Sequence, residues 1–120
     1  MDKTAGVAVC YLSTSKRPSS MSEYVKSRKL NRMQTLLASL GITVRDVYVD
    51  EDFEQTSADK PGLKRIVDQL PKKEFGVFVT ESIYDLSDNF SECIEILQYM
   101  IAHHIRVICL DNHIDSAMDA

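Results

Sequence analysis

The sequence predicts a three-layer α/β fold, a mainly parallel four-stranded sheet with helices on both faces. Four short segments rich in Val, Ile and aromatic residues alternate with longer segments that have helical spacing of apolar residues. Three of the short segments are nearly continuous apolar runs, as in strands that are covered on both faces. The length of 120 residues suits one domain, which we expect to span residues 1–120.

The predicted strands differ in how apolar they are. They cover Gly6–Leu12, Ile42–Val49, Phe75–Thr80 and Ile105–Leu110. Arg45 and Asp46 interrupt the second, so we place that strand at an edge of the sheet.

Three helices are predicted between the strands. The first covers Ser22–Leu40, with Gly41 in a left-handed cap after it. The second starts with Asp59 as N-cap and Pro61 in its first turn. The third covers Ser87–His103. Its predicted inward side chains are Phe90, Cys93, Ile94, Leu97, Met100 and Ile101.

Charge and composition limit the classes of function. The net charge of -4 at pH 7 predicts that any DNA binding by the isolated domain is weak. The N-terminus has no basic stretch followed by an apolar core, and no apolar run approaches the roughly 18 residues that span a bilayer. We therefore expect a cytoplasmic protein with no membrane partner.

The three cysteines, Cys10, Cys93 and Cys109, lie in apolar segments and not at ligand spacings. This placement predicts buried, reduced thiols. Neither a metal site nor a cofactor is expected.

Two long irregular segments follow strands, at the sheet edge where α/β folds build sites. The loop from Ser13 to Ser20 is hydroxyl-rich and basic and leads into a helix, a setting that suits a phosphate or another anion. Its candidate ligands are Thr14, Ser15, Lys16 and Arg17. A solvated linker is the alternative. The loop from Asp50 to Ala58 is acidic, and a solvated turn is favoured there over a cation site.

The first loop contains no glycine. It therefore matches neither the phosphate-binding G-x-x-x-x-G-K-[ST] motif nor the dinucleotide-binding G-x-G-x-x-G motif.

The order of motifs resembles the catalytic domain of serine recombinases of the resolvase/invertase type, over about Gly6 to Asn112. The family's Y-x-R-x-S-T motif corresponds to the end of the first strand, Val9 to Thr14. Its D-E-G-V-S-G-T-S-x-D-R-P-G-L segment aligns without a gap with Asp50 to Leu63. Its L-D-R-L-S-R motif corresponds to Ile83 to Asp88, and the last strand fits as well.

The resemblance implies that Ser13 is the nucleophile that attacks a DNA phosphodiester, with Asp59 and Lys60 as further catalytic positions. In the family, arginines stabilise the negative charge of the transition state. Here the residues at the matching positions differ: Tyr11, Asp85 and Asp88 replace arginines, Lys60 replaces another, Tyr84 replaces an aspartate, and Glu54-Gln55 replaces a Ser-Gly pair.

Three functions remain open. The favoured one is a degenerate recombinase domain that acts as an interaction or regulatory module, as a homodimer or with an intact recombinase. The second is an active strand-cleaving recombinase that uses Ser13. The third is a phosphate- or anion-binding module at the Ser13–Ser20 loop. We also expect that the family's long dimerisation helix and DNA-binding domain do not fit within 120 residues.

Overall fold

The structure, a computed structural model, describes residues 4–14, 19–51 and 60–118. Its sheet has five strands in the order β2-β1-β3-β4-β5. The strands are β1 (Val7–Thr14), β2 (Thr43–Glu51), β3 (Val77–Thr80), β4 (Arg106–Cys109) and β5 (Ile114–Asp115). The helices are α1 (Ser19–Ser39), α2 (Pro61–Gln69) and α3 (Phe90–Ala102), with the short 3-10 helices η2 (Leu70–Lys72) and η3 (Ile83–Asp85).

The predicted α/β class is confirmed, but the predicted number of strands was wrong by one. β2, β1, β3 and β4 are parallel, and β2 lies at the edge as expected. The fifth strand, β5, pairs antiparallel with β4 over two residues. A two-residue strand has too few side chains to show an alternating pattern, so the sequence gives no signal for it.

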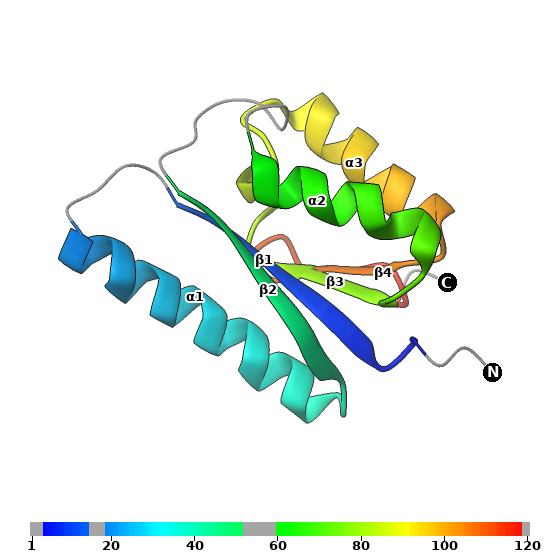
Figure 1. Cartoon of the computed structure of the whole chain (residues 1–120), viewed down its shortest axis with the longest axis horizontal. Coiled ribbons are helices and arrows are strands. Elements are labelled where there is room, and N and C mark those ends of the chain that lie inside the picture. Colours follow the sequence, from blue (N-terminus) through cyan, green and yellow to red (C-terminus); the bar gives the residue numbers. More distant parts are fainter. Residues whose placement is uncertain (1–3, 15–18, 52–59, 119–120) are drawn as a thin grey trace.

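Helices cover the two faces of the sheet unequally: α1 lies on one face, and α2 and α3 lie on the other (Figure 1). Alternate residues of β1 point to opposite faces, as strand geometry requires. Cys10 and Leu12 pack with Met33 and Leu37 of α1. Tyr11 belongs to the larger core, which the apolar sides of α2 and α3 complete.

The start of α3 differs from the prediction. The helix begins at Phe90, and its N-cap is Asn89, whose side chain accepts a hydrogen bond from the Glu92 N–H. Ser87 lies before the helix and accepts from the Asn89 N–H. Because the helix starts later, Phe90 occupies its first turn and is 56% exposed.

Two other expectations about the helices need correction. Ile101, predicted to face inward, is 47% exposed. The N-cap of α2 is Lys60, one residue later than predicted, and Asp59 lies outside the described residues. The predicted left-handed Gly41 is confirmed, with a φ of 71°.

The parallel strands end at one edge of the sheet. Ser13 of β1 is in register with Asp50 of β2, and Tyr11 is in register with Thr80 at the end of β3. The polar residues at these strand ends therefore meet.

Candidate functional site

Ser13 and Lys60 are brought together by the fold. The Lys60 ammonium donates a hydrogen bond to Ser13 Oγ with an Nζ–Oγ distance of 2.6 Å. Ser13 is 8% exposed and Lys60 is 4% exposed. Both side chains come from element ends, one at the end of β1 and the other at the N-cap of α2, so the fold brings them to the same edge of the sheet.

Asp50 anchors the start of α2 beside this pair. Its carboxylate accepts hydrogen bonds from the backbone N–H groups of Gly62 at 2.8 Å and Leu63 at 3.0 Å. The first N–H groups of a helix have no partner within the helix, and a carboxylate suits that position. Asp50 is 2% exposed. The expectation of a solvated acidic turn was therefore wrong for this residue.

Gly62 permits this close approach. A Cβ atom at that position would lie 2.9 Å from Asp50 Oδ1. Pro61 precedes it at the first position of the helix, where its lack of an N–H costs nothing.

Tyr11 is the residue at which the family's Y-x-R-x-S-T motif has its arginine. Its hydroxyl donates to Asp50 Oδ2 at 2.7 Å. Burial raises the pKa of Tyr11 strongly, and the hydrogen bond to Asp50 and the charge of that carboxylate raise it further. The side chain is therefore neutral, and it supplies no positive charge.

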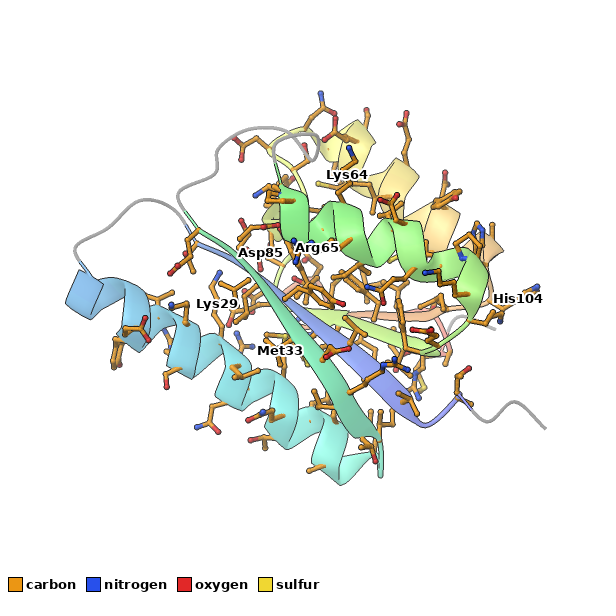
Figure 2. The ribbon with its side chains drawn as sticks, in the orientation of Figure 1. Lys29, Met33, Lys64, Arg65, Asp85 and His104 are labelled. Carbon is orange, nitrogen blue, oxygen red and sulfur yellow. The ribbon has the colours of Figure 1, made fainter. Side chains whose placement is uncertain are left out.

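Asp85 is the residue at which the family's L-D-R-L-S-R motif has its first arginine. It is 8% exposed and lies at the carboxyl edge of the sheet (Figure 2). Its Oδ1 pairs with Lys29 Nζ at 3.2 Å, and its Oδ2 accepts from Thr80 Oγ1 at 3.3 Å. Lys29 also donates to the Ser13 carbonyl oxygen at 3.1 Å. Burial raises the pKa of Asp85, and the Lys29 charge opposes the rise. A carboxylate therefore stands close to the backbone of the nucleophile position.

Three cations on α1 reach the ends of successive strands. Lys26 pairs with Glu51 at 2.9 Å, and Lys29 pairs with Asp85 of η3. Arg32 bridges Glu81 at 2.7 Å and Asp111 at 2.9 Å. Each of these cations is already matched by an acid of the strand edge.

The anion-binding loop predicted after β1 is only partly described. Ser15, Lys16 and Arg17 lie outside the described residues, so their role stays a prediction. Thr14 is 3% exposed, and its Oγ1 has no hydrogen-bond partner among the described residues. Strand alternation turns Thr14 to the face opposite Ser13, so these two hydroxyls do not converge.

Tyr84 and Asp88, two further substituted positions, are not part of the buried cluster, and Glu54 and Gln55 lie outside the described residues. Tyr84 is 51% exposed and Asp88 is exposed as well. Among the described residues of the family motifs, Tyr11, Ser13, Lys60 and Asp85 are buried together at this edge.

Asp50 and Lys29 were missed as site residues by the sequence analysis. Asp50 had a usable signal, because it ends a predicted strand at the edge where sites form. Lys29 had none, because it is one of several cations on a polar helix and its partner is 56 positions away in the chain.

The three cysteines are free and buried, as predicted. Burial raises the pKa of Cys10 to about 11 and that of Cys109 to about 12, so both stay protonated thiols near neutral pH.

Across residues 4–14, 19–51 and 60–118, no group of three or more potential ligand side chains is placed to hold a metal ion. No helix in the same part of the chain is long and apolar enough to cross a membrane.

The fold and this site define an α/β domain with a serine at the carboxyl edge of its sheet. Residues 8–120 match the family model described as the resolvase N-terminal domain. The chain therefore belongs to the resolvase family. A search of curated proteins gives no match.

Solved structures agree on the fold. The N-terminal catalytic domain of TP901-1 integrase has a TM-score of 0.79 and 18% identity, covering 92% of this chain and 82% of that one. The C-terminal catalytic domain of ISC1926 TnpA, an IS607-like serine recombinase, has a TM-score of 0.74 and 16% identity, covering 87% and 70%. A resolvase family site-specific recombinase from Streptococcus pneumoniae has a TM-score of 0.74 and 15% identity, covering 94% and 78%.

Proposed function

We propose that this domain is a serine recombinase homologue in which DNA strand cleavage is impaired and which acts by interaction. The observation that supports this most directly is the buried Asp85, which pairs with Lys29 where the family places an arginine. The Lys29–Asp85 pair has no net positive charge with which to hold a phosphodiester, whereas an arginine would bind it.

The expected loss of rate is large. Each missing cationic contact removes about 2–4 kcal/mol of transition-state stabilisation. Three such losses amount to about four to nine orders of magnitude in rate. Lys29 does not restore the charge, because Asp85 lies 3.2 Å away and neutralises it.

The proposed interaction partners are a second copy or an intact recombinase, with DNA bound only weakly by this domain alone. Phe90 and Ile101 of α3 are 56% and 47% exposed, and at about 100° per residue their side chains leave the helix on the same side. Exposed apolar groups on one side of a helix are compatible with a protein contact surface.

The second candidate function is strand cleavage by Ser13. The observation in its favour is the 2.6 Å hydrogen bond from Lys60, which keeps a cation on the nucleophile position.

Covalent capture on DNA tests both functions. The domain is incubated with suicide-nicked duplexes that trap a phosphoserine link, and adducts are separated by denaturing electrophoresis. We expect no adduct, either from the domain or from Ser13→Ala. An adduct that disappears in Ser13→Ala would establish strand cleavage and overturn the proposal. Mixing with an intact family member tests the interaction, by light scattering of the mixture against each component.

A further inference from the structure

The contact between Lys60 and Ser13 has a chemical consequence beyond the proposed function. Lys60 is 4% exposed and forms no ion pair with any residue of the described ranges. Its hydrogen bond there is to the hydroxyl oxygen of Ser13, at 2.6 Å. An amine at that distance from a serine hydroxyl is within reach of its proton.

Lysine differs from the arginine of the family motif at this position. An arginine stays protonated in proteins, so it can hold an anion but cannot accept a proton. A lysine can release its proton and then act as a base. Serine–lysine pairs are a recurring arrangement of nucleophile and base on unrelated folds.

Asp50 connects the two segments that carry the pair. Asp50 binds the N–H groups of Gly62 and Leu63, two and three residues beyond Lys60, and it also accepts from Tyr11 two residues before Ser13. Asp50 is therefore a positioning residue that ties both segments together. This keeps Lys60 Nζ and Ser13 Oγ at hydrogen-bond distance, as a proton transfer requires.

The same surroundings select for the charge of a substrate. Asp50 and Asp85 are buried carboxylates beside β1, and Asp85 is linked to the Ser13 carbonyl oxygen through Lys29. Because Lys29 and Asp85 neutralise each other, this side of the site offers an anion no net positive charge, whereas a neutral molecule needs none.

We infer that Lys60 is the general base for Ser13 and that this pair reacts with neutral activated esters of phosphorus or carboxylic acids. With a fluorophosphonate, Ser13 Oγ forms a bond to phosphorus while the P–F bond breaks. The electron pair of that bond leaves with fluoride. Lys60, the donor in the structure, first loses a proton to solvent, and the Ser13 hydroxyl proton then moves to the amine, which becomes an ammonium again.

The test uses the full chain and a neutral alkyl fluorophosphonate, followed by intact-mass spectrometry over time and mapping of the modified peptide. We expect a single adduct on Ser13 that is absent in Ser13→Ala. Ser39→Ala is the matched control, because that exposed serine donates only to a carbonyl of its own helix. It should label at the rate of the unmodified protein.

The Lys60→Arg variant distinguishes two roles of residue 60, that of a general base and that of a fixed positive charge. It keeps a cation and a donor but cannot accept the proton, so labelling should slow by about 100-fold or more. Thermal melting shows whether each variant is folded. Lys60→Ala provides a second measurement, in which added ethylamine should restore part of the rate.

Two results would overturn the inference. One is labelling of Lys60→Arg at the original rate, which would make residue 60 a fixed charge only. The other is the absence of any Ser13 adduct in the unmodified protein. Neither result depends on the DNA capture experiment, so this inference and the proposed function fail separately.

Discussion

Replacement of Asp50 by asparagine tests how the site is held together. Its two carboxylate oxygens accept three hydrogen bonds, from the Tyr11 hydroxyl and from the N–H groups of Gly62 and Leu63. An amide has one oxygen and one NH2 group. Oδ1 faces Gly62 and Oδ2 faces Leu63, so either orientation leaves one backbone N–H opposite a donor.

The magnitude follows from these contacts. One buried N–H without a partner costs about 1–3 kcal/mol. The remaining hydrogen bonds have a neutral acceptor in place of a carboxylate, and this weakening lowers the free energy of unfolding by about 1–2 kcal/mol more. We expect Asp50→Asn to lower the free energy of unfolding by about 2–5 kcal/mol in total. In a domain of this size that is about 4 °C of melting temperature for each kcal/mol.

Urea unfolding followed by circular dichroism measures the effect. Asp46→Asn is the matched control, because Asp46 lies on the same strand but is exposed, with its carboxylate 3.4 Å from Arg45. It should change stability by less than about 0.5 kcal/mol. Equal midpoints for Asp50→Asn and the unmodified protein would refute the anchoring role of Asp50.

Three further changes have expected outcomes. Gly62→Ala places a Cβ 2.9 Å from Asp50 Oδ1 and should lower stability by about 1–3 kcal/mol in urea unfolding; an unchanged midpoint would argue against tight packing at this position. Lys29→Met leaves a buried carboxylate on η3 without its cation and should lower thermal stability by about 2–4 kcal/mol, an effect that a merely exposed ion pair would not show. The hydrogen bond from Arg106 lowers the pKa of Asp115 below 3.8, so the stability contributed by this pair is complete above that pH and is lost as pH falls through the lowered pKa. The deficit of Asp115→Asn should therefore be largest near neutral pH and shrink in acid, and a deficit that does not vary with pH would contradict this assignment.

Much of the fold could be predicted because it depends on local patterns. Continuous apolar runs marked the inner strands, and Arg45 and Asp46 marked the edge strand correctly. The predicted start of α3 was wrong because Ser and Asn are both favoured N-cap residues, so the sequence alone does not distinguish Ser87 from Asn89. In the structure Asn89 is the N-cap.

The site was less predictable, since its contacts join distant parts of the chain. Motif order identified Ser13 and Lys60, and the fold brings them together. The partners of Asp50 and Asp85 depend on strand register and on the placement of α1. One polar helix offers several cations, and its sequence does not say that Lys29 is the one that reaches Asp85.

The pair formed by Lys29 and Asp85 also limits which side chains these two positions accept. An arginine at position 85 would place a second cation beside Lys29, where 3.2 Å now separates opposite charges. At about 4 Å, two like charges repel by about 4 kcal/mol in a partly solvated protein environment. An arginine at position 85 is therefore compatible with this edge only if Lys29 changes as well, and a change at Lys29 alone leaves Asp85 without its counterion. Positions 29 and 85 therefore act as a unit, and substitution of either one alone is less stable than a matched change of both.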